Sequence, residues 1–127
     1  QLLELYSYPQ ITIAAHTHQH RLLSSITQEE IRQELQGSKD ILEQLLNTEI
    51  LSVAFPAGKF NKNVIGIAKE VGFDKLYSSI PGFYFYEFLP GVKKRSLVQD
   101  ASASEFRSIL KGGDHIFARW YQKKHYS

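Results

Sequence analysis

The feature that most constrains the fold is a long amphipathic segment between two short apolar ones. Thr27 and Glu30 have capping-box spacing, and Ile31, Leu35, Ser38, Leu42 and Leu45 repeat at helical spacing, which predicts a helix over 27–47. Segments 11–15 and 50–55 are short, apolar and partly β-branched, which predicts buried strands. Strands joined by a crossover helix favour a parallel sheet, so we expect an α/β fold.

The rest of the chain continues this alternation. We expect a helix tail over 1–6 that ends before Pro9, a helix over 62–71 that Asn61 caps and Gly72 stops, and a strand over 74–79. An aromatic-rich loop over 81–91, a strand over 94–98, a capped helix over 102–110 and a final aromatic helix or tail to residue 127 complete the series. The pattern alone fits an open sheet and a barrel equally well.

Composition excludes several classes of protein. The chain has 127 residues, of which 43% are hydrophobic, and its net charge is only +2, so it has the composition of a globular domain without a strong basic field. It has no cysteine, which excludes disulfides and thiolate metal sites, and no apolar run long enough to span a membrane. Because the chain begins at Gln1 and contains no methionine, we expect that its original N-terminus has been removed.

Three histidines follow the first predicted strand: His16, His18 and His20. Loops at the carboxyl ends of parallel strands hold the chemistry in α/β folds, and neutral imidazole is the commonest metal ligand. On a strand all three would share one face, and on a helix His16 and His20 would. In either case a pair of imidazoles can converge on one ion, whereas the alternative is a solvated polar loop.

The run from Ile13 to His20, with the Glu-rich helix after it, resembles the second motif of the polysaccharide deacetylase family, His-(Ser/Thr)-x-x-His. Val53 to Gly58 is similar to the family's third motif, an aromatic-Pro-aromatic-Gly turn, and Val71-Gly72-Phe73 is similar to the segment that closes the next helix. The resemblance implies that His16 and His20 are metal ligands, that Thr17 braces the loop, and that His18 occupies a variable position.

The resemblance implies a distorted (β/α) barrel of the polysaccharide deacetylase type, present here only in part, with residues 1–127 as a single partial catalytic domain. It implies a metal-dependent deacetylase, a hydrolase that removes N- or O-linked acetyl groups from an acetylated polysaccharide, with zinc as the expected divalent metal. The turn would supply a backbone N–H of Ala57 as an oxyanion donor, and Phe55 and Pro56 would contact the substrate.

Departures from the family pattern point to an incomplete site. The first motif, Thr-Phe-Asp-Asp-Gly, which supplies a third ligand and a general base, has no match, so we expect that this piece by itself is inactive. Ala54 and Ala57 stand where many members have Arg and Tyr. For the general acid, His115 is the late candidate.

Other interpretations remain open. A non-catalytic relative could keep this fold and bind metal or glycan without turnover. A structural zinc site is disfavoured because it would require four protein ligands, often cysteines. Basic runs such as 93–95 raise nucleic-acid binding as a third reading, but we expect no nucleic acid partner.

We expect the aromatic side chains of 83–88 to pack as a hydrophobic plug in the fold rather than bind sugar rings. The sequence leaves the compartment undetermined, although the family resemblance favours the cell surface or secretion.

Overall fold

In the computed structural model, the long helix α2 (Gln28–Leu46) begins where the capping box predicts. The Thr27 side chain accepts a hydrogen bond from the Glu30 N–H, and the Glu30 carboxylate accepts one from the Thr27 N–H at 2.9 Å. At the other end Asn47 adopts a left-handed conformation, with φ 49°. Both ends of α2 are therefore set by local sequence, as expected for a capped helix.

The structure describes residues 1–83, 87–96, 98, 100–112 and 123–124, and it divides the chain into two compact units, Gln1–Leu76 and Tyr77–Ser127. Each unit is considered by itself. The expectation that 1–127 is one partial domain stays a prediction.

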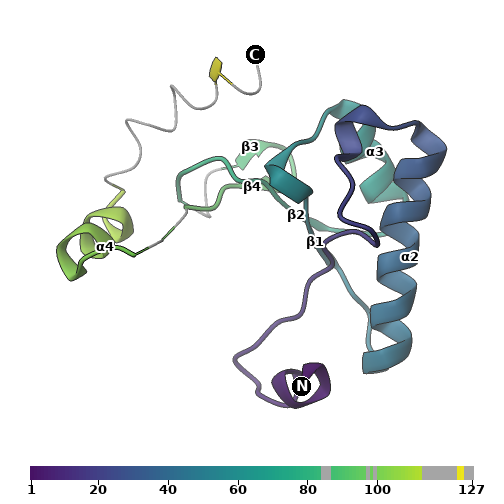
Figure 1. Cartoon of the computed structure of the whole chain (residues 1–127), viewed down its shortest axis with the longest axis horizontal. Helices are drawn as coiled ribbons and strands as arrows, with labels where there is room; N and C mark the ends of the chain where they lie inside the picture. Colours follow the sequence, from purple (N-terminus) through teal and green to yellow (C-terminus); the bar gives the residue numbers. More distant parts are fainter. Residues whose placement is uncertain (84–86, 97, 99, 113–122, 125–127) are drawn as a thin grey trace. The chain divides into compact units, whose positions relative to one another are not determined.

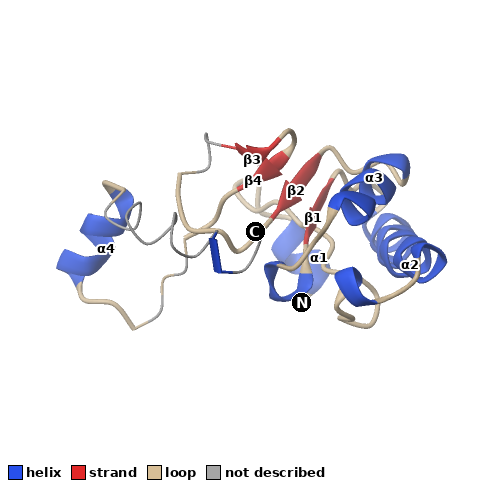
Figure 2. Cartoon of the chain, turned by 90° about the horizontal axis from the view of Figure 1, so that it is seen from above, coloured by secondary structure: helices blue, strands red, loops and turns tan. Residues whose placement is uncertain are grey.

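The sheet of the first unit is formed by short strands. β1 (Ser52–Ala54) forms a parallel bridge with Ala15, and the oxygen of Leu51 accepts the N–H groups of Asp74 and Lys75 where β2 (Lys75–Tyr77) begins. Figure 2 shows β1 and β2 next to each other, with α2 and α3 (Lys62–Glu70) side by side to one side of them. The predicted α/β fold with a parallel sheet is therefore confirmed.

The core of this unit lies between the strands and the two helices (Figure 1). Each apolar side chain buried there contributes about 1.5–3 kcal/mol relative to an exposed position. Asn61 caps α3 by accepting the Val64 N–H at 3.0 Å, and Gly72 ends the following turn at φ +97°. The fully buried apolar side chains of this unit include Leu23, Ile31, Leu35, Val53, Phe55, Val64, Phe73 and Leu76.

Lys39 is a buried cation that joins three elements of the first unit. Its Nζ donates to the backbone oxygens of Ile50 at 2.8 Å and Gly72 at 3.4 Å, and it lies 3.2 Å from a carboxylate oxygen of Glu43. The side chain is only 9% exposed. Because a buried charge is tolerated only when it is paired and hydrogen-bonded, these partners explain how α2 can carry a lysine on its inner face.

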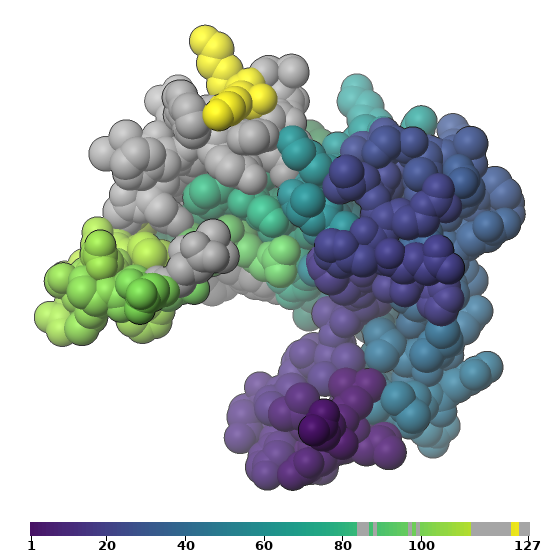
Figure 3. Space-filling view, viewed as in Figure 1, coloured from purple at the N-terminus to yellow at the C-terminus, as the bar shows by residue number. Residues whose placement is uncertain are grey.

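Helix α1 (Leu2–Tyr6) has no buried residue, and its segment forms a lobe on the surface in Figure 3 (dark purple). The prediction of a helix that ends before Pro9 is confirmed. None of the helices in the described part of the chain combines the length and apolar composition needed to cross a membrane.

In the second unit, β3 (Glu87–Leu89) and β4 (Val92–Lys93) form an antiparallel hairpin. The oxygen of Lys93 accepts the N–H of Ser78, and the oxygen of Ile80 accepts the N–H of Arg95. β1 is the neighbour of β2, and β4 is the neighbour of β3. Helix α4 (Ala103–Leu110) begins with the predicted capping box of Ser102 and Glu105.

Several predicted boundaries of strands, and one predicted buried position, are wrong. Segment 11–15 contributes one bridge residue instead of a strand, because only Ala15 is paired with β1. In α2, Leu46 is buried and Leu45 is 49% exposed, because the last turn directs the later leucine inward. Strand β4 lies at 92–93 instead of 94–98, and β3 falls inside the expected aromatic loop. Residues 84–86 of that loop lie outside the described residues.

Candidate metal centre

The histidine loop begins at a residue that the sheet holds firmly. Ala15 is 1% exposed; its N–H donates to the Ser52 oxygen at 2.8 Å, and its oxygen accepts the Ala54 N–H at 2.9 Å. The chain therefore leaves the sheet at a fixed point, and His16 is the next residue. His16 thus follows a residue in a parallel bridge to β1, which corresponds to the strand ends where α/β proteins place functional side chains.

His16 is oriented by the neighbouring strand. Its Nδ1 lies 2.7 Å from the backbone oxygen of Ala54. A carbonyl oxygen can only accept, so Nδ1 carries the proton and donates, and the lone pair of the neutral ring is on Nε2. Metal-binding histidines characteristically donate their second ring N–H to a carbonyl or carboxylate in this way.

His20 lies against His16. The two ring centroids are 4.8 Å apart, with an angle of 65° between the ring planes, and both side chains are exposed to solvent. Two imidazoles on one tetrahedral zinc ion have their centroids roughly 5 Å apart, given zinc–nitrogen bonds of about 2.0–2.1 Å. The separation of this pair therefore fits two ligands of a single divalent ion.

The loop between the two histidines has an unusual backbone. Thr17 has φ 66° and His20 has φ 56°, both in the left-handed region that non-glycine residues avoid. The buried Thr17 Oγ1 makes no hydrogen bond in the described part of the chain, so the structure provides no bond for its expected bracing role. Strained conformations of this kind persist only where their surroundings fix them, and they cluster at functional sites.

His18 lies apart from the histidine pair. Its N–H donates to the Glu34 oxygen at 3.1 Å, and its side chain lies beside Gly37 of α2, where an added Cβ would come within 3.8 Å of the imidazole ring. A pocket of about 300 Å³ lies along this side of the loop, lined by Ala14, His16, Thr17, His18, Ser38, Ile41 and Leu42. The structure thus brings His16 and His20 together and directs His18 to the helix.

The pair needs further ligands to form a catalytic site. Catalytic zinc is typically held by three protein ligands. Among the described residues, no group of three or more His, Cys, Asp or Glu side chains could hold a metal ion. The residues present therefore fit two ligands of such a site and no more.

The turn after β1 carries the other predicted site residues. Ala57 is exposed, with φ 52° and ψ 15°, and no acceptor for its N–H is found among the described residues. Phe55 and Pro56 are fully buried, and Phe55 packs on Phe60 with ring centroids 5.5 Å apart. Their side chains form the base of the turn, and the expected contact of both with substrate stays a prediction.

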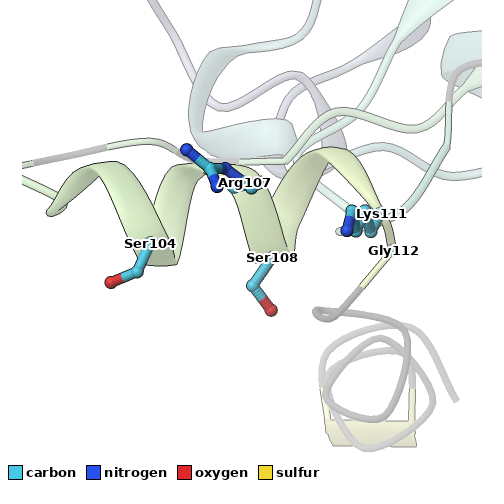
Figure 4. Close-up of a pocket in the computed structure, with 5 residues that line it drawn as sticks. All are labelled: Ser104, Arg107, Ser108, Lys111 and Gly112. Carbon is cyan, nitrogen blue, oxygen red and sulfur yellow. The ribbon is translucent and has the colours of Figure 1, made fainter.

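The predicted general acid, His115, lies outside the described residues. In the second unit, a hollow of about 410 Å³ lies along α4 and its C-terminal end, lined by Ser104, Arg107, Ser108, Lys111 and Gly112. Figure 4 shows Ser104 and Ser108 pointing the same way from successive turns. This hollow contains none of the predicted site residues.

A charged pair follows the histidine loop directly. Arg21 Nη2 lies 2.9 Å from Glu30 Oε1, and both side chains are more than one-third exposed. The backbone N–H of Thr27, then its hydroxyl and the Arg21 guanidinium, lower the pKa of Glu30 from 4.5 to about 2. The carboxylate at the start of α2 is therefore ionised at neutral pH.

Sequence reasoning missed two groups that shape the loop: the Ala54 carbonyl and the Glu34 carboxylate, which accepts the Gln19 N–H at 2.7 Å. The sequence carries no signal for the first, because any residue has a carbonyl. A signal for the second does exist, since Glu34 falls on the same helix face as Ile31 and Leu35, among residues that the pattern buries.

Comparisons with known proteins bear on the family and the fold. The family model described as polysaccharide deacetylase matches residues 1–76, which is the range of the first compact unit. The Bacillus subtilis (strain 168) protein YxkH, named as a polysaccharide deacetylase, is 24% identical over 72 residues, which are 57% of this chain and 26% of that protein.

Solved structures show the same fold. The Streptococcus pyogenes deacetylase PplD, solved in complex with acetate, has a TM-score of 0.71 at 20% identity over 76% of this chain and 43% of its own. A Bacillus cereus polysaccharide deacetylase has a TM-score of 0.67 at 22% identity over 78% of this chain and 32% of its own. The chain thus spans less than half the length of each of these relatives. On the family match over most of its length, the chain belongs to the polysaccharide deacetylase family.

Proposed function

We propose that this chain forms part of the active site of a divalent-metal-dependent hydrolase that removes acetyl groups from an acetylated polysaccharide. The observation that carries the proposal is the contact of His16 with His20, at 4.8 Å between ring centroids, with His16 oriented by the Ala54 oxygen. Family membership supports the deacetylase activity. Beyond family membership, the proposal adds the dependence on a divalent metal and the acetylated polysaccharide as substrate.

His16 and His20 would hold the metal, for which zinc is our first expectation because two imidazoles and a carboxylate suit it. A divalent metal bound at such a site polarises an acyl carbonyl and lowers the pKa of a water molecule. The Ala54 carbonyl keeps the Nδ1 of His16 protonated, so Nε2 is presented as a ligand without a change of tautomer. We propose that the third ligand is a carboxylate from a part of the protein outside the described residues.

Hydrolysis of an acetyl group builds negative charge on the carbonyl oxygen. The Ala57 N–H, held in an exposed left-handed turn, is the donor that we propose for this oxyanion, and one such donor is worth about 2.7–4 kcal/mol. His115 remains our proposal for the general acid. The buried Phe55 and Pro56 support this function by fixing the turn that carries Ala57.

We also propose that the complete fold is a distorted (β/α) barrel in which this chain forms one part. The parallel pairing of Ala15, β1 and β2, with α2 as the crossover between strands, supports this proposal. The greater length of the relatives supports it too.

The test is release of acetate from acetylated chito-oligomers by the full-length protein. We expect activity that a chelator removes and added Zn²⁺ restores, and that His16→Ala and His20→Ala abolish. His18→Ala is the matched control, since it alters the same loop without touching the pair, and it should stay active. Acetate release that is unaffected by a chelator and by His16→Ala would contradict the proposal.

A second candidate is a non-catalytic relative that binds metal or glycan without turnover. Ala54 and Ala57, which stand where many family members have Arg and Tyr, favour it. Zn²⁺ binding by the full-length protein without acetate release from any acetylated glycan would support this candidate over the first.

A further inference from the structure

Glu34 is a buried carboxylate in the middle of α2. The residue is 5% exposed, and no ion pair in the described part of the chain includes it. Burial of an ionised carboxylate is unfavourable unless other groups compensate for it. A residue at this position needs a physical reason, because an apolar side chain would fill the same space without this cost.

The reason lies in the histidine loop. Glu34 Oε2 accepts the Gln19 N–H at 2.7 Å, and the backbone oxygen of Glu34 accepts the His18 N–H at 3.1 Å. One helical residue therefore holds two consecutive amide groups of the loop, one with its side chain and one with its main chain. A carboxylate that accepts an amide N–H makes a stronger hydrogen bond than a neutral acceptor does.

These two bonds lie between the two strained residues of the loop. Thr17 and His20 have φ of 66° and 56°, and a left-handed conformation is unfavourable for an ordinary residue. The amide held by the carboxylate belongs to Gln19, the residue directly before His20. Loss of that bond would let the backbone relax where the His20 side chain begins.

We propose that Glu34 is a positioning residue for the metal centre, which holds the loop so that His20 faces His16. The inference rests on the proposed function, because it assumes that the pair binds a metal. Among the contacts of the described residues, none joins Glu34 to the ring of His16 or His20; Glu34 acts through the backbone of residues 18 and 19.

The same helix provides a matched control. Glu43 Oε1 accepts the Ile50 N–H at 2.9 Å, so it too is a carboxylate of α2 that holds a backbone amide. That amide leads into β1 instead of the histidine loop. Loss of the Glu43 carboxylate should therefore lower stability and leave the metal centre unchanged.

The experiment compares Glu34→Leu, Glu34→Asp, Glu34→Gln and Glu43→Leu in the full-length protein. Zn²⁺ affinity is measured by titration against a competing chelator, and the exchange rate of the Gln19 amide is measured in the metal-free protein. We expect Glu34→Leu to weaken Zn²⁺ binding about 10–100-fold, the range for groups that orient a metal ligand. The Gln19 amide should exchange faster in that variant.

Glu34→Gln keeps an oxygen acceptor at the same reach and should retain most of the affinity, whereas the shorter Glu34→Asp should lose it. Glu43→Leu should bind Zn²⁺ like the unaltered protein. If Glu34→Leu fails to fold, Glu34→Asp decides. A folded Glu34→Leu or Glu34→Asp variant with unaltered Zn²⁺ affinity would overturn the inference. Absence of Zn²⁺ binding by the unaltered protein would instead overturn the proposed function and, with it, the role of Glu34 toward a metal.

Discussion

His16 Nδ1 lies 2.7 Å from the backbone oxygen of Ala54, a residue 38 positions further along the chain. Ala54 also donates its N–H to the oxygen of Ala15, the residue before His16. The pairing of the two segments and the orientation of the histidine ring therefore depend on the same residue of β1. The ring of His16 is therefore oriented by a strand backbone, as the proposed metal site requires.

This contact predicts the tautomer of His16 in the metal-free protein. The neutral ring should carry its proton on Nδ1, because the Ala54 oxygen can only accept. Long-range proton–nitrogen correlation spectra at mildly alkaline pH should show this tautomer for His16, with the exposed His18 as the internal comparison. An Nε2–H tautomer for His16 would contradict the assignment of its metal-binding nitrogen.

The capping box of α2 predicts a pH dependence of stability. The folded protein holds the pKa of Glu30 at about 2, below its ordinary value of 4.5, chiefly through the Thr27 N–H. The ionised carboxylate therefore stabilises the fold fully above about pH 4.5, and this contribution is lost as the pH falls toward 2. Denaturant unfolding across this range should show a shallower decline for Glu30→Gln than for the unaltered protein. Equal slopes would contradict the prediction.

Replacement of Lys39 by an uncharged side chain should lower the stability of the protein. Lys39→Met removes the donor to the Ile50 oxygen and leaves a buried carbonyl without a partner, which should cost about 1.5–3 kcal/mol in the free energy of unfolding. Urea unfolding measures this change. Lys62→Met, at an exposed position at the start of α3, is the control, and an equal effect of the two substitutions would contradict the role of Lys39.

Two glycines near each other in sequence should respond in opposite ways to alanine. Gly66 is exposed within α3 with nothing within 4 Å of an added Cβ, so Gly66→Ala should stabilise the protein by about 0.5–1 kcal/mol. Gly72 has φ +97°, and an added Cβ would meet Lys39 Nζ at 3.5 Å, so Gly72→Ala should destabilise it. The two thermal midpoints check this, and a shift in the same direction for both would contradict it.

The sequence predicted those elements that local interactions determine. Thr27, Asn61 and Ser102 each cap a helix as expected, because a cap needs only the side chain and the next few N–H groups. The family motif singled out His16 and His20, and the structure places their rings 4.8 Å apart; their role as ligands stays a prediction. These features depend on residues close together in the chain.

The sequence predictions are wrong where the structure depends on contacts between residues far apart in the chain. Segment 11–15 has strand composition, yet only Ala15 is paired with β1, since pairing depends on a neighbour and not on composition. The exposure of Leu45 in place of Leu46 depends on what packs against the last turn of α2. Likewise, the hydrogen bond from the Gln19 N–H to the Glu34 carboxylate joins residues 15 positions apart, so it depends on where the loop packs against the helix.

The most direct test of the central claim is the Zn²⁺ content and affinity of the full-length protein and of its three single histidine variants. We predict that the unaltered protein and His18→Ala bind Zn²⁺ alike, because His18 faces α2, and that His16→Ala and His20→Ala lose binding. Retention of Zn²⁺ by a folded His20→Ala variant would contradict the claim that His16 and His20 bind one metal ion together.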